Sequence, residues 1–272
     1  MKILVYGANG WIGSQFIELL SDVKYACGEA RTDNENEVAN EILEYRPTHV
    51  ISFIGSTIEQ EGKLTENIRD NLFAPLVLAT ICKKYNIHYT YLGTGCIFKY
   101  DEEDPTYEFE ERSLPNFFGS SYSVVKGFTD RLMHLYDDDA LNIRIRMPIT
   151  GDENPRNFIT KITTYEKICS VSNSMTVLPE LLPLVFDMMM HNITGTMNLT
   201  NPGTISHNEI LDMYRELVDP SFEWQNFTEV SILDSDRSNN CLDTRLLESL
   251  YPDILGIKDA VRKCMMTYKT TE

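Results

Sequence analysis

Basic residues are scarce in this sequence. It has 24 Lys and Arg against 41 Asp and Glu, which gives a formal net charge of −17. Binding to a phosphate backbone needs a basic surface, so we expect no nucleic-acid partner. A phosphorylated small molecule would need a local cluster of arginines to offset the overall negative field.

Long apolar runs are also missing. No run approaches the roughly 20 residues that a membrane-spanning helix needs, so we expect no membrane partner. The apolar start of the chain, MKILVYGANGWIG, lacks the longer apolar region and the small-residue cleavage site of a signal peptide. We interpret it as a buried strand and expect a cytoplasmic protein.

The six cysteines lack the spacing of a metal site. None forms a C-x-x-C pair, and the five histidines show no ligand spacing beside them. We therefore predict no metal. In a reducing compartment the thiols should be free.

Short β-rich runs alternate with helical patterns in the first half of the chain. The pattern predicts strands at Lys2–Tyr6, Val50–Ile54, His88–Leu92 and Asn142–Met147, and helices at Trp11–Leu20, Thr65–Tyr85 and Tyr122–Tyr136. Strands that alternate with helices indicate βαβ units. We predict an α/β fold, a Rossmann-type doubly wound parallel sheet with a smaller C-terminal substrate-binding lobe.

The alternation weakens after Pro148, where prolines and glycines punctuate shorter elements. We therefore expect residues 1–150 to form the dinucleotide-binding domain. Residues 151–272 should form mainly the substrate-binding lobe, with some segments returning to the first domain. The acidic segment Asp101–Glu111 interrupts the pattern, and we expect a solvated loop there, with a lid as the less favoured alternative.

A glycine-rich turn follows the first strand. Gly7, Gly10 and Gly13 give the pattern G-x-x-G-x-x-G at the start of a helix, with the spacing usual in short-chain dehydrogenases. Such a turn lets a pyrophosphate approach the free N–H groups of the helix. The full set of predicted cofactor contacts here and after the Val50–Ile54 strand is Gly7, Asn9, Gly10, Trp11, Ile12, Gly13, Phe53 and Gly55.

The residue that binds the cofactor's ribose, and so determines the preference for NADPH or NADH, should follow the second strand. We expect that strand to end near Gly28. Arg31 in this place could pair with the 2′-phosphate of NADPH, whereas an acidic residue would bind the ribose hydroxyls of NADH. Glu29 lies close enough to leave that second possibility open. Arg31 could also be a solvated loop charge.

Tyr122 and Lys126 are four residues apart on a predicted helix and so share one face. A lysine beside a phenol lowers the pKa of the phenol, which suits it to proton transfer at a carbonyl. Thr94, at a polar strand end, can bind the same carbonyl oxygen. Cys96 points to the same side of the chain and could act as a base, although a free cysteine is more often a small packing residue.

Several runs resemble one enzyme family. They are GWIG (Gly10–Gly13), PTHV (Pro47–Val50), TGCIF (Thr94–Phe98), RIRMPI (Arg144–Ile149), NPRNFITKI (Asn154–Ile162), NSMTVL (Asn173–Leu178), NPG and SHNEIL (within Asn201–Leu211) and RSNN (Arg237–Asn240). Together with the Tyr122 and Lys126 pair, they resemble the bifunctional UDP-4-keto-6-deoxyglucose 3,5-epimerase/4-reductases of UDP-L-rhamnose synthesis. These are extended short-chain dehydrogenase/reductases. The likeness to GDP-fucose synthase is more distant.

The resemblance implies roles for single residues. Thr94, Tyr122 and Lys126 would form the reductase triad, Cys96 and Lys161 would be the epimerase base and acid, and NADPH would be the cofactor. The predicted substrate contacts, chiefly to the UDP group, are Asn71, Arg156, Asn157, Arg237 and Asn239. Analogy with related folds suggests a homodimer.

Three other functions remain open from the residues. The first is a reductase without epimerase activity, which would not need the Cys96 thiol. The second is a GDP-sugar enzyme similar to GDP-fucose synthase, since no residue identifies the base. The third is a non-catalytic dinucleotide-binding subunit, similar to the regulatory subunit of methionine adenosyltransferase. The presence of Thr94, Tyr122 and Lys126 together disfavours that third function.

Overall fold

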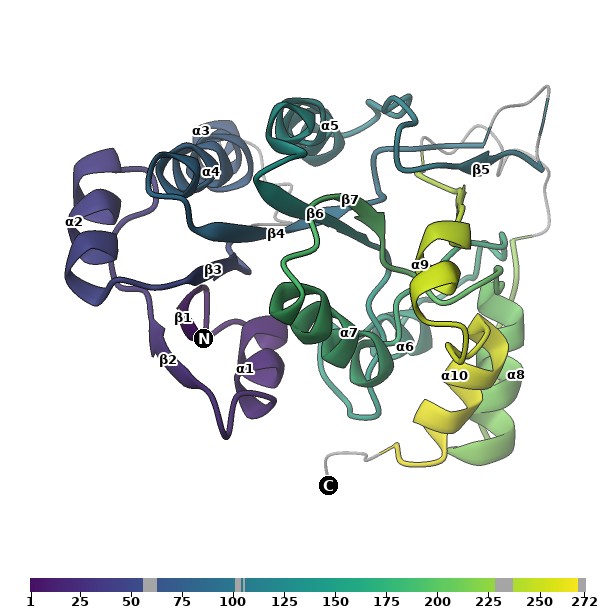
Figure 1. The fold of residues 1–272 in the computed structure, drawn as a ribbon. Helices are drawn as coiled ribbons and strands as arrows, with labels where there is room; N and C mark the ends of the chain where they lie inside the picture. Colours follow the sequence, from purple (N-terminus) through teal and green to yellow (C-terminus); the bar gives the residue numbers. More distant parts are fainter. Residues whose placement is uncertain (56–62, 101–103, 105, 228–236, 269–272) are drawn as a thin grey trace. The chain divides into compact units, whose positions relative to one another are not determined.

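The computed structural model contains a six-stranded sheet, whose strands come from Lys2 to Asn198 (Figure 1). The structure describes residues 1–272 except 56–62, 101–103, 105, 228–236 and 269–272. The strands follow the order β2-β1-β3-β4-β6-β7. Their bounds are β1 Lys2–Tyr6, β2 Lys24–Cys27, β3 His49–Ser52, β4 His88–Thr94, β6 Ala140–Ile145 and β7 Gly195–Asn198. The pairs β1–β2, β1–β3 and β3–β4 are parallel.

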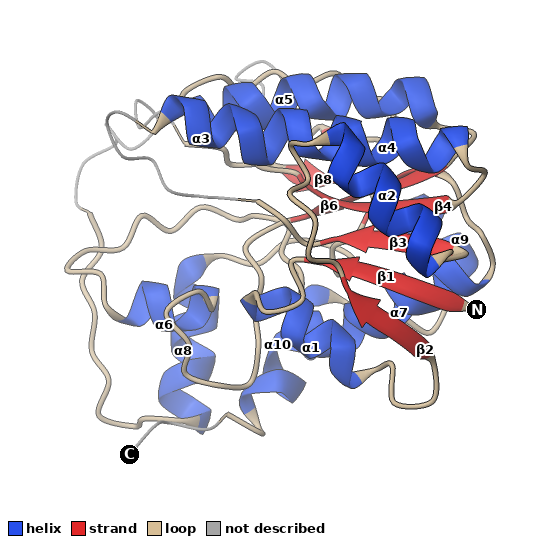
Figure 2. Ribbon diagram, turned by 90° about the vertical axis from the view of Figure 1, so that its left-hand side faces the viewer, coloured by secondary structure: helices blue, strands red, loops and turns tan. Residues whose placement is uncertain are grey.

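Helices cover both faces of this sheet (Figure 2). The helices α2, α4 and α5 lie on one face, and α1 and α7 lie on the other. The described helices are α1 Trp11–Glu18, α2 Glu35–Tyr45, α3 Leu64–Ile68, α4 Ala74–Lys84, α5 Ser121–Met133, α6 Phe158–Thr163, α7 Leu178–Met190, α8 His207–Leu217, α9 Arg245–Leu250 and α10 Ile257–Met265, with a π-helical turn η1 Arg69–Phe73 and a 3₁₀ turn η2 His134–Tyr136. This arrangement confirms the predicted doubly wound α/β fold.

Burial on both sides explains the composition of the strands. β1, β3, β4 and β6 are almost wholly buried, as expected for parallel strands covered by helices on each face. Their side chains meet α2 and α4 in one core, which includes Leu4, Val38, Val50 and Leu78. Each such aliphatic side chain contributes about 1.5–3 kcal/mol when it is fully buried.

The chain divides into two compact units. Unit 1 consists of the described residues of Met1–Ile97, Leu114–Arg144 and Leu182–Met197. Unit 2 consists of those of Phe98–Ser113, Ile145–Leu181 and Asn198–Glu272. The described residues of Phe98–Ser113 thus belong to unit 2 and those of Leu182–Met197 to unit 1, each apart from the neighbouring segments of the sequence. Unit 2 has its own core, in which Ile159 of α6, Leu211 of α8 and Val261 of α10 are fully buried.

The acidic segment Asp101–Glu111 differs in part from the solvated loop that the sequence predicted. Residues 101–103 and 105 lie outside the described residues, but the segment's later part is not simply a solvated loop. Glu108–Phe109 forms the short strand β5, which pairs in parallel with β8, Cys241–Leu242. The Phe109 ring is buried and stacks on Phe98 with a centroid distance of 4.5 Å. The acidic neighbours of Phe109 made this buried side chain difficult to recognise from the sequence.

None of the helices described is long and apolar enough to span a membrane. Within the residues that the structure describes, His, Cys, Asp and Glu side chains form no group of three or more that could hold a metal ion.

Candidate functional site

The glycine turn between β1 and α1 is shaped by close backbone contacts. Gly7 has φ of +73°, and a Cβ there would lie 2.9 Å from the carbonyl carbon of Phe53. A Cβ on Gly13 would lie 2.2 Å from the Gly7 carbonyl oxygen. Both positions therefore require glycine. Gly10 caps α1 without a side-chain hydrogen bond, so the first N–H groups of the helix remain available for an anion.

The other predicted cofactor contacts surround this turn in unit 1. Asn9 is exposed, and Trp11 and Ile12 are half-buried in the first turn of α1. The Phe53 ring packs on Phe16 at a centroid distance of 5.2 Å. Their exposure leaves Asn9, Trp11 and Ile12 accessible to a ligand at the helix start.

Gly55 lies beside Asn71, a predicted substrate contact. A Cβ on Gly55 would be 3.0 Å from Asn71 Oδ1. Asn71 is only 1% exposed, its Nδ2 donates to Asn67 Oδ1 at 2.7 Å, and its backbone oxygen accepts from Thr129 Oγ1 at 2.6 Å. These contacts hold the η1 turn against α5. They give Asn71 a structural part in unit 1 that the sequence did not reveal.

Arg31 follows β2, as expected, and its side chain is 65% exposed. Its guanidinium is held by Asp33 through two bonds, from Nε at 3.1 Å and from Nη2 at 2.8 Å. Arg31 lowers the pKa of the Asp33 carboxyl by hydrogen bonding and charge. A 2′-phosphate could replace this carboxylate, because an exposed ion pair contributes little stability.

Three of the predicted catalytic residues lie where β4 ends and α5 begins. Thr94 is the last residue of β4, and its Oγ1 accepts a bond of 3.1 Å from the backbone N–H of Cys96. Ser123 Oγ donates to the Cys96 carbonyl oxygen at 2.8 Å. This bond ties the strand end to the first turn of α5, which carries Tyr122 one residue earlier. Ser120 caps that turn by accepting from the Ser123 N–H at 3.1 Å.

Lys126 lies one turn further along α5 and is buried. Its Nζ donates to the Tyr91 hydroxyl at 2.5 Å and to the Leu92 carbonyl oxygen at 3.3 Å. Burial lowers the pKa of Lys126 to about 7, while the nearby Asp130 and Cys96 act in the opposite direction. Burial therefore makes the ammonium form of Lys126 less favourable than it is in water. Tyr91 is a contact that the sequence analysis missed.

The remaining predicted residues belong to unit 2. Lys161 is exposed on α6, and Arg156 is exposed in the turn before it. Asn157 is fully buried and caps α6 by accepting from the Ile159 N–H at 3.2 Å, and its Nδ2 donates to the Thr150 and Asp152 carbonyl oxygens. The side chain of Asn157 thus organises this loop. These contacts within the loop are enough to account for an asparagine at this position, even if it binds no ligand.

The RSNN segment is held in place by a buried arginine. Arg146, only 1% exposed, donates from Nη2 to the Ser238 carbonyl oxygen and to Asn173 Oδ1, each at 2.7 Å. Asn239 Oδ1 accepts from Asn173 Nδ2 at 3.0 Å. Arg237 is exposed. The sequence indicated Arg146 only as part of the RIRMPI run. The structure shows that its side chain holds the RSNN segment in place.

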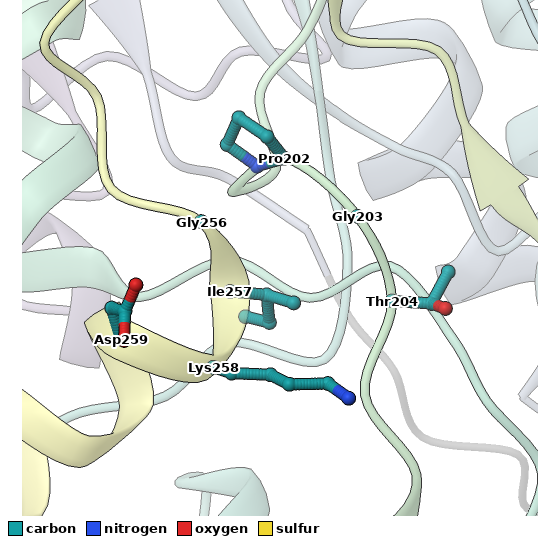
Figure 3. A pocket seen from close by; sticks show the side chains of 7 residues that line it. All are labelled: Pro202, Gly203, Thr204, Gly256, Ile257, Lys258 and Asp259. Atoms are coloured by element: carbon teal, nitrogen blue, oxygen red, sulfur yellow. The ribbon is translucent and has the colours of Figure 1, made fainter.

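A pocket of about 240 Å³ lies elsewhere in unit 2, between Pro202–Thr204 and the start of α10 (Figure 3). None of the predicted site residues lines it. Lys258 at its edge is paired with Glu209 at 2.5 Å. The pocket is therefore separate from the residues discussed above.

The chain belongs to the NAD dependent epimerase/dehydratase family, whose model matches residues 3–164. It is similar to protein L780 of Acanthamoeba polyphaga mimivirus, with 50% identity over 99% of both chains. The crystal structure of that protein, described as the L780 UDP-rhamnose synthase, superposes with a TM-score of 0.93 over 98% of this chain and 99% of that one. The family resemblance predicted from the sequence runs is thereby confirmed.

Two Arabidopsis thaliana proteins are also similar. The bifunctional dTDP-4-dehydrorhamnose 3,5-epimerase/dTDP-4-dehydrorhamnose reductase is 40% identical over 96% of this chain and 91% of its own length. A trifunctional UDP-glucose 4,6-dehydratase/UDP-4-keto-6-deoxy-D-glucose 3,5-epimerase/UDP-4-keto-L-rhamnose-reductase is 40% identical over 97% of this chain, which spans 41% of that longer protein.

Proposed function

We propose that this protein is an enzyme of UDP-L-rhamnose synthesis. It epimerises UDP-4-keto-6-deoxy-D-glucose at C3 and C5 and reduces the C4 ketone with NADPH. The names of relatives at 40–50% identity over nearly the whole chain support this proposal. We also propose that it is cytoplasmic and, by analogy with related folds, that it works as a homodimer.

The observation that carries the proposal is the arrangement at the end of β4. The Cys96 backbone is bonded on one side to Thr94 Oγ1 and on the other to Ser123 Oγ of α5. The backbone of Cys96 is thus held between the threonine and the helical turn that carries Tyr122. A reductase needs only the threonine, the tyrosine and the lysine, so the thiol is what favours an added epimerisation.

The glycine turn fits a dinucleotide. The two positions that tolerate no Cβ bring the backbone close, and α1 offers N–H groups without a side-chain cap. When bound, NADPH supplies the hydride for the C4 ketone. Arg31 is our candidate for the 2′-phosphate, and Phe53 and Gly55 for further contacts.

The chain's own residues would handle the protons and the developing charge. The C4 ketone acidifies the protons at C3 and C5, and Cys96 removes each of them in turn. Thr94 and the Tyr122 hydroxyl stabilise the enolate oxygen by hydrogen bonding. Lys161 returns a proton, which inverts the centre. In the reduction, Tyr122 donates its proton to the C4 oxygen, and Lys126 supports the tyrosine and holds the nicotinamide ribose.

The UDP group needs cations in this acidic protein. Arg156 and Arg237 are both exposed and remain our candidates for its phosphates, with Asn239 as a neutral partner. Asn157 and Asn71 are buried and engaged in their own units, so we propose that they support substrate binding by shaping the backbone around it.

Deuterium exchange tests the proposal. In D₂O with UDP-4-keto-6-deoxyglucose and NADPH, the wild type should place deuterium at both C3 and C5 of UDP-rhamnose. Cys96→Ser should lose this exchange, because a hydroxyl is far too weak an acid to supply a base near neutral pH, compared with a thiol of pKa about 8.5. Its product, if formed, should be the unepimerised 6-deoxy sugar.

The exposed Cys27 on β2 offers a matched control. Cys27→Ser should exchange deuterium as the wild type does. Lys161→Ala should still allow some proton removal while inversion fails. Exchange at the wild-type rate in Cys96→Ser would mean that the thiol is a packing residue and that another base is at work.

A further inference from the structure

The ammonium group of Lys126 is held by one aromatic side chain. Lys126 Nζ donates to the Tyr91 hydroxyl oxygen at 2.5 Å and lies 4.5 Å from the centroid of the same ring. Lys126 is 5% exposed and Tyr91 is 1% exposed. A charge removed from water to this extent needs partners that replace the water, and Tyr91 supplies a hydroxyl and a π face together.

Tyr91 occupies a position where a hydrocarbon side chain would be ordinary. It lies in the interior of β4, a strand buried on both faces, three residues before Thr94. A tyrosine here brings a hydroxyl into the core, and that hydroxyl must be hydrogen-bonded to be tolerated. Its recorded bond is to the lysine of the proposed triad. None of the proton transfers proposed for catalysis involves Tyr91.

We infer that Tyr91 is a positioning residue, which holds the Lys126 ammonium at the carboxyl end of β4. Its importance for turnover rests on the proposed function, but the contact itself does not. Tyr91 acts through Lys126 and has no assigned contact with substrate or cofactor.

The groups around Lys126 determine the sign of the expected effect. Asp130 faces it from α5, Cys96 from the segment after β4, and Tyr91 from β4, while Tyr122 contributes to the electrostatics of Tyr91. Because Lys126 donates to the tyrosine oxygen, the bond favours the charged form of the lysine. Loss of the hydroxyl should therefore make Lys126 easier to deprotonate and shift its titration to lower pH.

A pair of substitutions in the same strand tests this. Tyr91→Phe keeps the ring and removes the hydroxyl. Tyr89→Phe removes the same group from a residue that is also 1% exposed and in the same core, two positions earlier on β4. Protein labelled with [ε-¹³C]lysine is titrated by NMR, and the Lys126 signal is identified by its loss in Lys126→Arg. We expect Tyr91→Phe to lower the titration midpoint by about one pH unit and Tyr89→Phe to leave it unchanged.

The inference is overturned if Tyr91→Phe titrates like the wild type, or if Tyr89→Phe shifts Lys126 equally. Should Tyr91→Phe fail to fold, the wild type still decides. A nuclear Overhauser contact from the Lys126 ε-protons to a tyrosine ring, retained in Tyr122→Phe, supports the inference. Absence of that contact overturns it.

Kinetics separate this inference from the proposed function. The alkaline limb of kcat/KM for NADPH-dependent reduction should move to lower pH in Tyr91→Phe, with a loss of about tenfold above the midpoint. A shifted lysine titration in a protein that does not turn over the UDP sugar would retain Tyr91 as a positioning residue and reject the proposed function. Turnover of the UDP sugar together with an unshifted Lys126 titration would support the proposed function and reject Tyr91 as a positioning residue.

Discussion

Lys126 illustrates what single residues reveal and what they hide. The four-residue spacing from Tyr122 was readable because a helix places such residues on one face. The contact with Tyr91 was not, since an aromatic residue inside a predicted strand normally indicates core packing. Only the fold brings β4 and α5 together and turns a packing residue into a partner for a charge. The same holds for Ser123 and its bond to the Cys96 carbonyl oxygen.

Tyr122→Phe should abolish most of the reductase activity. The variant keeps the ring but has no proton to give to the C4 oxygen, and loss of a positioned proton donor lowers rates by about 10²–10⁴-fold. NADPH consumption with the UDP-4-keto sugar measures the effect. Tyr25→Phe, at an exposed tyrosine on β2, serves as the control and should consume NADPH normally. Activity of Tyr122→Phe equal to that of the control would exclude Tyr122 as the acid.

Arg31→Ala should raise the KM for NADPH by about 10–100-fold and leave NADH use nearly unchanged, because charge-assisted hydrogen bonds to the 2′-phosphate are lost. Asp33→Asn provides the matched test. It releases the guanidinium from the carboxylate that now holds it and removes a negative charge, so KM for NADPH should fall. Both constants come from initial rates with each cofactor. Equal changes for NADPH and NADH in Arg31→Ala would show that Arg31 does not read the phosphate.

At the level of elements, strongly patterned segments were predictable and polar or short ones were not. β1 and the start of α1 lie where the sequence put them, and the helix expected over Thr65–Tyr85 is present as α3, η1 and α4. α2 was missed because polar residues dominate it, although Asn34 caps it by accepting from the Asn36 and Glu37 N–H groups. β7 was missed because its four residues, GTMN, are too few to show the alternation of apolar and polar side chains that indicates a strand.

The buried pair that joins α5 to β6 should be the most sensitive ion pair among those described. Asp130 Oδ1 and Oδ2 accept from Arg144 Nε and Nη2, each at 2.8 Å, with both side chains nearly or fully buried. Asp130→Asn leaves a buried guanidinium without its counter-charge, which should lower the free energy of unfolding by about 3–5 kcal/mol. Urea unfolding measures this directly.

A second ion pair calibrates that measurement. Arg215 and Asp212 on α8 lie 2.8 Å apart but both are about half exposed. Asp212→Asn should change the free energy of unfolding by less than about 1 kcal/mol. Similar losses in Asp130→Asn and Asp212→Asn would contradict the importance of burial at the α5–β6 contact.

At the scale of the whole molecule, the chain passes between the two units more often than the sequence suggested. Phe98–Ser113 leaves unit 1 directly after the Thr94–Cys96 segment and returns before α5. Nothing in its acidic composition signals this, because its place depends on β5 pairing with β8 more than a hundred residues later. Such pairings are set by tertiary packing, which local propensity does not contain.

Three buried histidines, from both units, should make the protein less stable in mild acid. Burial lowers the pKa of His49 and His88 in unit 1 and lowers that of His207 in unit 2 to about 4. As the pH falls, the histidines of the unfolded chain take up protons near pH 6.5, whereas those of the folded protein take them up only at lower pH. Stability is therefore complete above about pH 6.5 and is lost as pH falls toward the folded pKa values.

His207→Gln tests the unit 2 contribution. In the wild type, the free energy of unfolding should fall by about 2–3 kcal/mol between pH 7 and pH 4.5 on account of His207 alone. Urea unfolding at a series of pH values should show that much less pH dependence in the variant. His191→Gln, at a histidine that is 68% exposed, should retain the wild-type dependence. Because carboxylates such as Asp33 and Glu209 have lowered pKa values, their contribution falls mainly below this range. An unchanged pH dependence in His207→Gln would mean that burial does not hold this imidazole neutral in the folded protein.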